Sequence, residues 1–582
     1  MNHSNFLPIN KKDLQKRKIQ QLDIIIITGD AYVDHPSFGP VIIARFLESH
    51  GYTVGIISQP DINNDNDFVE LGRPKLFFGI SSGNMDSMIN HYTAQKKIRS
   101  QDAYSPDGKI GLRPDRAVIK YSQIVKRLFK GVPIILGGTE ASLRRIPHYD
   151  FWSDKIRNSI LFDSQADILV YGMGEKQILQ IAQLLETKNL SEITEIKGTV
   201  VKIRYISQND RIIFLPEYDK LFNKKKFWQM SQEFENFYRT KTIMQKFSGF
   251  YLKHNPPAMP LEQKELDNLY SLPYSRKPHP KYKKSTIKAF EQIKLSITSH
   301  RGCFGGCNFC SIGYHQGKTI QSRSIKSIIS EIETIKRKDY FHGSISDIGG
   351  PSSNMYQMTC KIGISRTCKR NSCIYPKICE NLDHSHSYLK KLLRTIKKDD
   401  ELKNIFVASG IRFDLALKDE DYIKLISKNF TGGLLKLAPE HKSERVLKYM
   451  YKPKFDQYLE FYNKFRNFSK QVNKSQAIVP YIIVGHPGAT LQDTIELAIY
   501  LKKSNVRLKQ IQEFTPTPMT KSTMMYFTGL DDQGNKIHIS KGRELKLQKA
   551  LIQWFIPENR KFIIEALVKA KRKNLMRFFL NK

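Results

Sequence analysis

The sequence predicts an α/β protein in which an N-terminal doubly wound parallel-sheet domain precedes a partial (β/α)6 barrel. Short apolar runs such as "DIIIIT" (23–28) and "ADILVYG" (166–172) alternate with amphipathic segments such as "PVIIARFLESHG" (40–51). A second alternation of the same kind begins at "IKLSITS" (293–299). Short apolar strands that alternate with helices are typical of parallel sheets covered by helices on both faces.

The first alternation occupies residues 21–190, after a polar N-terminal arm at residues 1–20. Its strands lead into the loops "TGDAYVDHPSFG", "ISSGNMDS", "GGTEAS" and "GMGEK", which are rich in Gly and Ser. Ligands of such sheets bind at the carboxyl ends of the strands, although ordinary βα turns have the same composition. The absence of GxGxxG after the first strand disfavours NAD binding. Residues 191–288 are rich in Pro and charge, which predicts a linker and surface region.

Residues 289–550 contain the second alternation. Ser324 is the predicted N-cap of a helix in "SIKSIISEIETIKR", which has isoleucines along one face. The strand ends "GSISDIGG", "NIFVASGIRFD", "GGLLKLAPEH", "AIVPYIIVGHPG" and "LKQIQEFTPTP" follow at intervals that can hold helices. The active site of such a barrel lies on the loops that follow the strands. Residues 551–582 predict a basic helical tail, whose apolar side we expect to pack on the parent domain.

The chain is strongly basic, with 94 Lys and Arg against 56 Asp and Glu among 582 residues, a formal charge of +38. This charge favours anionic partners such as nucleic acid. A general compositional bias is the favoured explanation, because the basic residues are spread along the chain. Nucleic acid therefore stays open as a partner, but no RNP1, KH or zinc-finger pattern supports it.

All 7 cysteines lie after residue 302, which does not fit a disulfide scaffold. Reduced, metal-binding thiols and a cytoplasmic location fit better. The N-terminal residues contain no apolar core of a signal peptide. The longest apolar runs are far short of the ~20 residues that span a bilayer, so we expect no membrane association.

The stretch "RGCFGGCNFC" (301–310) places Cys303, Cys307 and Cys310 on one loop directly after a predicted strand. Thiolates favour zinc or iron–sulfur clusters, but structural zinc sites usually combine two cysteine pairs. Three ligands can hold three corners of a [4Fe–4S] cluster and leave one iron open to an exogenous chelate. The amino and carboxylate groups of S-adenosylmethionine (SAM) would serve as that chelate. Zinc or a structural cluster is the alternative.

CxxxCxxC after the first strand of a β/α barrel resembles the radical SAM superfamily. The segments "RKPHP", "IKLSITSHRGCFGGCNFCSIGYHQGK", "DIGGPSSNMY", "ASGIRFDL", "LKLAPEH", "YIIVGHPG" and "EFTPTPMT" are similar to the YgiQ-type family of uncharacterised radical SAM proteins. The resemblance runs from about residue 22 to the C-terminus. It implies a cobalamin-binding-like domain at 21–190 and a radical SAM core at 289–550. Because "DHPSFG" lacks the DxHxxG spacing, we expect a cobalamin-like fold without cobalamin.

The resemblance also implies a set of cofactor contacts. Gly349 and Gly350 match the GGE motif that contacts the SAM amino group, although Pro351 stands where Glu is usual. "GHPG" (485–488) is similar to a GxPGET segment near the adenine, with Ala489 in place of Glu. The remaining implied SAM contacts are Ser409 and Arg412, toward ribose or carboxylate, and Lys436 and Glu440, which could instead form a loop salt bridge.

The other four cysteines lie within "CKIGISRTCKRNSCIYPKIC". Their density and the basic residues around them, which favour thiolates, predict an auxiliary metal or Fe–S site. Unligated thiols beside the active site are the alternative. The residues concerned are Cys360, Cys368, Cys373 and Cys379, with Lys361, Arg366, Lys369 and Arg370 as basic neighbours.

The leading hypothesis is a radical SAM enzyme that cleaves SAM reductively to start radical chemistry on an unknown substrate. Its electron donor would be a protein such as flavodoxin or ferredoxin. No catalytic side chain is named, because the cofactor supplies the chemistry. The alternative is an RNA-binding protein stabilised by zinc or a structural Fe–S cluster, without catalysis. A cobalamin-dependent radical methylase is a third, narrower hypothesis.

Overall fold

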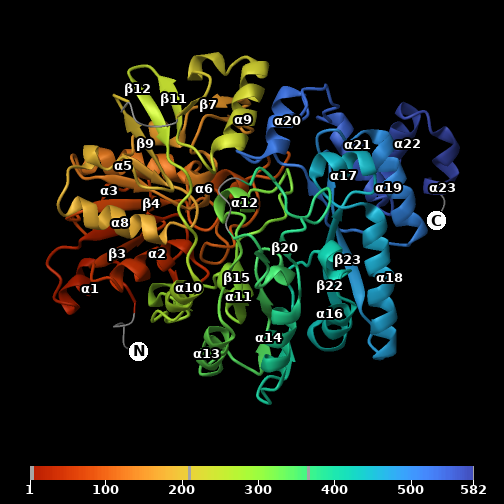
Figure 1. Ribbon diagram of the computed structural model, residues 1–582, viewed down its shortest axis with the longest axis horizontal. Coiled ribbons are helices and arrows are strands. Elements are labelled where there is room, and N and C mark those ends of the chain that lie inside the picture. Colours follow the sequence, from red (N-terminus) through yellow and green to blue (C-terminus); the bar gives the residue numbers. More distant parts are fainter. Residues whose placement is uncertain (1–5, 207–211, 364–367, 581–582) are drawn as a thin grey trace. The chain divides into compact units, whose positions relative to one another are not determined.

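The computed structural model describes residues 6–206, 212–363 and 368–580 (Figure 1). The chain divides into two compact units, which we call the N-terminal and the C-terminal unit. The first comprises Met1–Arg301, Ser311–His342 and Ser365–Lys369, and the second comprises Gly302–Cys310, Gly343–Ile364 and Arg370–Lys582. Strands and helices alternate in both, which confirms the predicted α/β class. No helix among the described residues is both long and apolar enough to cross a bilayer.

The N-terminal unit is built on a mixed sheet of nine strands. Its parallel half has the order β3 (Val54–Ser58), β1 (Ile24–Thr28), β4 (Phe77–Ser81), β5 (Ile134–Leu136) and β8 (Ile168–Val170). Every residue of β1 and β4 is buried, as expected for strands that are covered on both faces.

Two neighbouring residues of β4 show which helices cover each face of this sheet. Phe77 belongs to the apolar cluster that includes residues of α2 (Gly39–Glu48) and α8 (Glu175–Leu185). Phe78 instead contacts Phe129, which directly follows α5 (Ala117–Leu128), with ring centroids 4.9 Å apart. Because successive strand residues point to opposite faces, α2 and α8 cover one face and α5 the other. Helix α3 (Asp65–Val69) contacts α5 (Figure 1).

Residues 199–254, predicted to lie in a linker and surface region, extend this sheet instead. They form β9 (Thr199–Ile203), β10 (Ile213–Phe214), β11 (Ile243–Phe247) and β12 (Phe250–His254). β9 pairs antiparallel with β8 and β12, so the complete sheet is mixed, whereas its strands within residues 21–190 are parallel as predicted. A two-residue turn at Ser248 and Gly249, with φ +74° at the glycine, joins β11 to β12. This hairpin can bury its apolar residues only by adding to the sheet.

Shorter elements complete the N-terminal unit. Ser324 caps α13 as predicted, because its Oγ accepts from Ser327 N at 3.1 Å. The helices are α1 (Lys11–Lys16), α4 (Ser87–His91), α6 (Gly138–Leu143), α7 (Ile160–Asp163), α9 (Lys224–Phe237), α10 (Gln263–Tyr270), α11 (Lys288–Ile293), α12 (Ile312–His315) and α13 (Ile325–Lys336). The short strands are β2 (Val33–Asp34), β6 (His148–Asp150), β7 (Lys155–Arg157), β13 (Lys277–Pro278), β14 (Ser296–Thr298), β15 (His300–Arg301) and β16 (Gln321–Ser322).

The C-terminal unit contains parallel strands that follow one another in chain order. β17 (Ser344–Ile345) pairs with β21 (Asn404–Ile405), and β22 (Leu434–Glu440), β23 (Ala477–Val484) and β24 (Gln512–Glu513) form a second parallel group. A parallel bridge between Ile411 and Leu437 extends the pairing from the β21 segment to β22. β18 (Asp347–Gly349) follows β17, and β19 (Thr359–Cys360) forms a hairpin with β20 (Leu382–Asp383).

Helices fill the intervals between these strands and form the tail. They are α14 (Ser387–Lys397), α15 (Phe413–Ala416), α16 (Glu420–Leu425), α17 (Glu444–Met450), α18 (Phe455–Gln471), α19 (Leu491–Lys503), α20 (Lys521–Thr528), α21 (Arg543–Ile552), α22 (Arg560–Lys569) and α23 (Met576–Leu580). Ile563, Ala566 and Leu567 of α22 pack in one apolar cluster with residues of α19 and α21. The prediction that the basic tail packs its apolar side on the parent domain is confirmed.

Candidate functional site

The loop Gly302–Cys310 in the C-terminal unit presents three partly exposed thiols, from Cys303, Cys307 and Cys310. Gly302 and Gly306 have φ of +87° and +61°, in the left-handed region that glycine adopts without strain. Cys310 N donates to Cys307 O at 3.1 Å, which closes a turn around the last two cysteines. The two glycines therefore let nine residues fold back so that all three thiols belong to one short turn structure.

This cysteine loop is anchored to its own unit by backbone and amide hydrogen bonds. Asn308 N donates to Met450 O at 3.1 Å, and Asn308 Nδ2 donates to Tyr449 O at 2.9 Å. On its other side, Cys373 N donates to Phe304 O at 3.1 Å. A Cβ at Gly306 would lie 2.3 Å from the carbonyl oxygen of Asn371, so only glycine fits there. The loop is therefore fixed before any ligand binds.

Positive charge lies beside the thiols. Arg412 Nη1 is 3.5 Å from Cys307 Sγ, and Gly305 N donates to Cys303 Sγ at 3.4 Å. Burial raises the pKa of Cys303, and so does Cys307, whereas Gly305 N, Arg412 and Lys452 act in the opposite direction. Burial therefore favours the thiol, and the two cations favour the thiolate that a metal requires.

Each of these two cations has a buried carboxylate partner. Arg412 forms a bidentate ion pair with Asp414, at 2.8 and 2.6 Å, and both side chains are buried. Burial would raise the pKa of Asp414, but the Arg412 guanidinium lowers it, and the net pKa lies below its usual value. Lys452 lies 3.8 Å from Glu440, whose pKa is raised by burial. Asp414 and Lys452 were not singled out from the sequence.

The structure does not pair Lys436 with Glu440 in the way that the sequence had allowed. Both residues lie on β22, but the strand register shifts between Leu437 and Glu440. Lys436 is exposed as a result, while Glu440 is buried and forms its ion pair with Lys452. In a regular strand Lys436 and Glu440 would lie on the same face. The register shift places them in different environments.

Gly349 and Ser409, both predicted cofactor contacts, lie next to each other. A Cβ at Gly349 would be 2.3 Å from Ser409 Oγ. Asp347 joins them, because its Oδ1 accepts from Ala408 N at 2.7 Å and from Ser409 N at 2.9 Å, and its other oxygen accepts from the Ser409 hydroxyl. Gly350 directly follows β18 and is partly buried. Asp347 was not predicted as a site residue, although it lies in the predicted strand end "GSISDIGG", two residues before Gly349.

The "GHPG" segment follows β23 and is tightly packed. His486 is fully buried, and its Nε2 lies 2.7 Å from Ser522 Oγ. Burial lowers the pKa of His486 to about 3, so its imidazole is neutral. Gly488 has φ +89°, and a Cβ there would lie 2.3 Å from the ring of Tyr449. Tyr449 also holds the cysteine loop through Asn308, so this segment supports the loop.

The four-cysteine segment is only partly described, because Arg366 lies outside the described residues. Cys360 and Cys368 are exposed, and Cys373 and Cys379 are partly buried. Cys379 N donates to Cys373 O at 2.7 Å, and Cys373 is tied to Phe304 of the cysteine loop. Within the described ranges, no three His, Cys, Asp or Glu side chains are already close enough to hold a metal ion. The auxiliary site remains a prediction.

Three family models match successive parts of the chain. The Radical SAM N-terminal model matches residues 6–296, the Radical SAM superfamily model matches 297–501, and a domain of unknown function, DUF3362, matches 509–579. A UPF0313 protein of Clostridium botulinum (strain 657 / Type Ba4) is 46% identical over 99% of this chain and 92% of its own length. The chain belongs to the UPF0313 family of radical SAM proteins. The resemblance predicted from the sequence is confirmed.

Other UPF0313 proteins are similar over nearly the whole chain. One from Geobacter sulfurreducens is 44% identical over 99% of this chain and 96% of its own length. A UPF0313 protein of Yersinia pestis is 41% identical over 97% of this chain and 80% of its own length.

Two solved structures have a similar fold at low sequence identity. The radical S-adenosylmethionine methyltransferase TsrM from Kitasatospora setae, with cobalamin and a [4Fe–4S] cluster bound, has a TM-score of 0.53 at 12% identity and covers 96% of this chain and 99% of its own. The cobalamin-dependent S-adenosylmethionine radical enzyme OxsB has a TM-score of 0.51 at 11% identity and covers 97% of this chain and 73% of its own. These likenesses concern the fold.

The UPF0313 chain fills the carboxyl ends of β1 and β4 with its own side chains. Arg113 lies between Asp30 and Asp102 at 2.9 and 3.3 Å, and all three are almost fully buried. Arg113 Nη1 also donates to Ser82 O at 2.6 Å. Burial raises the pKa of Asp30 to about 6, against the opposing effect of Arg113. A Cβ at Gly83 would lie 2.1 Å from Asp30 Oδ1, so the Gly83 backbone packs directly against this carboxylate.

The adjacent Asp34 and His35 are also unavailable to a ligand. Asp34 forms a buried ion pair with Arg45 at 2.6 Å. His35 is fully buried, and burial together with the charge of Arg276 lowers its pKa well below the usual value. Asp34 and His35, which lack the DxHxxG spacing of a cobalamin signature, are therefore part of the core of this UPF0313 chain.

Proposed function

We propose that this UPF0313 chain is a radical SAM enzyme that holds a [4Fe–4S] cluster through Cys303, Cys307 and Cys310. The observation that carries the proposal is the anchored cysteine loop, which presents three thiols and has two cations beside it. The family models and the fold of the solved radical SAM enzymes support it. When bound, such a cluster would supply the electron that cleaves the sulfonium C–S bond of SAM reductively, with flavodoxin or ferredoxin as electron donor.

Arg412 and Lys452 would offset the negative charge of the three thiolates. Both groups are buried, so solvent screens their charge only weakly. Gly305 has no Cβ, and the position of such an atom would be 3.3 Å from Cys303 Sγ and 3.9 Å from Cys307 Sγ. The backbone can therefore approach a bulky inorganic ligand closely.

The SAM contacts would come from the ends of neighbouring strands. Gly349 and Gly350 leave backbone groups free of side chains at the end of β18, and Asp347 orients the Ser409 hydroxyl beside them. Glu440, at the end of β22, would meet the methionine amine. The consecutive parallel pairing of the strands in this unit agrees with a partial (β/α)6 barrel, whose loops after the strands would form the site.

We propose that the reaction proceeds without cobalamin, because Arg113, Asp30 and Asp102 occupy the strand ends of the N-terminal unit. We also propose that Cys360, Cys368, Cys373 and Cys379 hold a second metal or Fe–S site. Their segment is linked to the cysteine loop by the hydrogen bond from Cys373 N to Phe304 O. The substrate stays unassigned.

The test uses anaerobically reconstituted full-length protein, reduced with dithionite. We would record EPR spectra with and without SAM, and measure 5′-deoxyadenosine release by chromatography. Cys307→Ala is expected to lose both the SAM-dependent change in the [4Fe–4S]⁺ signal and SAM cleavage. Cys368→Ala, which removes an exposed thiol from the second site only, is the control and is expected to keep both. A cluster signal that SAM does not change, or a SAM-dependent change that survives in Cys307→Ala, would refute the proposal.

A further inference from the structure

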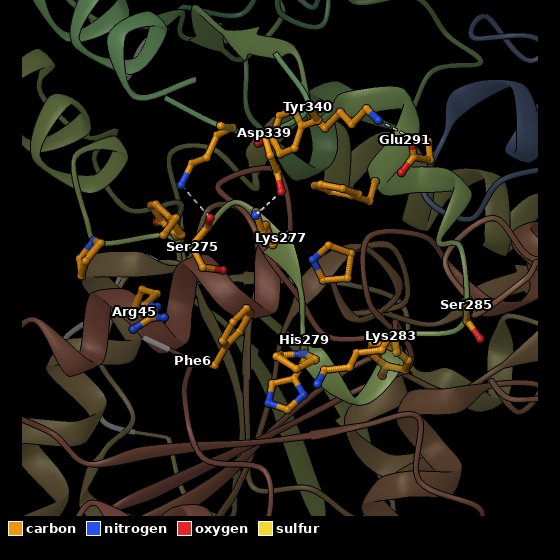
Figure 2. Close-up of a pocket in the computed structure, with 18 of the residues that line it drawn as sticks. Phe6, Arg45, Ser275, Lys277, His279, Lys283, Ser285, Glu291, Asp339 and Tyr340 are labelled. Carbon is orange, nitrogen blue, oxygen red and sulfur yellow. Dashed lines mark hydrogen bonds and ion pairs between the residues drawn. The ribbon is translucent and has the colours of Figure 1, made fainter. Parts of the chain in front are cut away.

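A cavity of about 1230 Å³ lies in the N-terminal unit beside residues 273–285 (Figure 2). Its other walls come from the C-terminal end of α2, from α11 and from residues 338–340, all within the same unit. Typical small-molecule pockets measure about 300–1,000 Å³, so this cavity can hold a ligand of nucleotide size or larger. Nothing in the proposed SAM site uses it.

The wall formed by residues 273–285 is rigidly held. β13 pairs with β2 in the register Lys277 to Asp34, and His279 N donates to Tyr32 O at 2.9 Å. Arg276, inside the same wall, forms a buried ion pair with Glu331 at 2.5 Å. The cavity is therefore preformed, which reduces the entropic cost of binding a ligand.

The lysines of this region outnumber the carboxylates that could neutralise them. Between residues 277 and 294 the sequence has 6 lysines and a single acidic residue, Glu291. Glu291 is engaged by Lys294, at 2.5 Å, and Asp339 by Lys277, at 2.8 Å.

Glu48, the remaining acidic residue of the lining, is paired with Arg17 and Arg45 at 3.3 and 2.7 Å. After these pairings, two lining lysines, Lys283 and Lys338, form no ion pair with any carboxylate among the described residues.

Lys338 shows how strongly this region favours negative charge. Its ammonium donates to Ser275 O at 3.0 Å, which is a neutral carbonyl. Burial lowers the pKa of Lys338, and the positive charges of Arg276 and Lys277 lower it further. An anion bound beside Lys338 would relieve this repulsion. Figure 2 shows Lys277 and Lys283 on the border of the same cavity.

Aromatic side chains line the cavity as well as lysines. Phe6, His279 and Tyr340 border the cavity in Figure 2. His279 stacks on Tyr32 with ring centroids 5.4 Å apart, and Phe6 packs edge-on against His279 at 5.1 Å. Flat rings next to cations are the combination that binds a base and its phosphate.

We propose that this cavity binds a nucleotide, with a phosphate on Lys283 and the base against the aromatic wall. The nucleotide is either free or a unit of single-stranded RNA, and both sources present the same base and phosphate. An acyl chain would leave the lysines without partners, and an acidic peptide would not use the rings. The proposal is independent of the cluster, because the cavity lies wholly within the N-terminal unit.

The test measures fluorescence anisotropy of fluorescein-labelled decauridylate with the reconstituted full-length protein over a series of salt concentrations. Lys283→Glu is expected to weaken binding at least fivefold and to lower the salt slope by about 0.7, the value for one phosphate contact on a single strand. Lys284→Glu is the matched control: its lysine is exposed and adjacent but outside the cavity lining, so the expected change is less than twofold. Phe6→Leu is expected to weaken binding without changing the salt slope.

Unlabelled AMP and ATP identify the source. If they displace the RNA at micromolar concentration, the ligand is a free nucleotide, and if only RNA competes, it is a strand. Equal losses for Lys283→Glu and Lys284→Glu, or equal competition by hexaglutamate, would overturn the proposal in favour of non-specific attraction. Cys307→Ala is expected to bind as wild type does, so a failure of the proposed SAM chemistry remains distinguishable from a failure of this site.

Discussion

Replacing Arg412 with Met is expected to destabilise the C-terminal unit strongly and in a pH-dependent way. The substitution leaves Asp414 buried, at 5% exposure, without its guanidinium partner. Removing one member of a buried ion pair costs about 3–5 kcal/mol. For a domain of 150–250 residues, each kcal/mol shifts the Tm by about 2–4 °C, so we expect a loss of roughly 6–20 °C.

The loss of stability in Arg412→Met is expected to depend on pH, because it depends on the ionisation of Asp414. In the wild type, Arg412 lowers the pKa of Asp414 in the folded state. The ion pair therefore stabilises the fold at pH values above the pKa of Asp414 in the unfolded chain, and this stabilisation is lost as the pH falls through its pKa in the folded state. In Arg412→Met the guanidinium no longer offsets burial, and only Lys452 and a backbone hydrogen bond still lower the pKa of Asp414, so we expect burial to raise this pKa. The variant therefore loses stability as the pH rises above the unfolded pKa, and its deficit relative to wild type is expected to be larger at pH 8 than at pH 5.

The assay is thermal unfolding of the wild type, Arg412→Met and the double variant Arg412→Met/Asp414→Asn between pH 5 and pH 8. The double variant removes the unpaired charge and is expected to recover much of the lost Tm at pH 8. A deficit of Arg412→Met that is independent of pH, with no recovery in the double variant, would show that Arg412 acts through packing and would refute this reasoning.

Four further predictions concern other parts of the two units. Gly306→Ala should cost about 1–2 kcal/mol from its left-handed backbone alone, plus the clash with Asn371 O, and should lower the iron content after reconstitution. Gly529→Ala is the control, because Gly529 also has a positive φ and a Cβ there would meet no atom of the described residues. Asp347→Ala removes two backbone hydrogen bonds and one hydroxyl bond and should weaken SAM binding in equilibrium dialysis about tenfold, whereas unchanged affinity would exclude this strand end from the SAM site. Asp30 has a folded pKa of about 6, above its unfolded value, so its contribution to the stability of the wild type is lost as the pH rises from 4 to 6. In urea unfolding, Asp30→Asn should abolish this loss. A pH profile of stability that is the same in Asp30→Asn and wild type would contradict the prediction. Hydroxocobalamin added to the reconstituted protein should leave no bound corrinoid spectrum after gel filtration.

The cysteine loop could be predicted from the sequence because its chemistry depends on spacing within ten residues. Cys303, Cys307 and Cys310 are local in the chain, and the glycines between them indicate a tight turn. Their roles as ligands remain a prediction. Arg412 was also singled out, and it lies beside Cys307. Its partner Asp414 is only two residues away, in the first turn of α15, yet nothing in the sequence pattern distinguishes it from the other carboxylates that follow predicted strands.

Features that depend on distant or irregular backbone were not predictable in the same way. Lys452 reaches Glu440 from beyond α17, and the register shift in β22 decides which face Glu440 occupies. The strands β11 and β12 could have been recognised, because "IMQKF" and "FYLKH" are separated by the turn dipeptide Ser-Gly. The surrounding Pro and charge obscured this hairpin and favoured the interpretation as a linker.

The cluster of Asp30, Asp102 and Arg113 restricts the order in which substitutions can accumulate in this family. Loss of Arg113 first would leave two buried carboxylates without a cation, the most costly intermediate of the possible routes. Loss of Asp30 first leaves one complete ion pair behind. To make room for a large ligand at this end of the sheet, evolution or design would therefore have to replace Asp30 or Asp102 before Arg113. The three positions should covary among relatives rather than change independently.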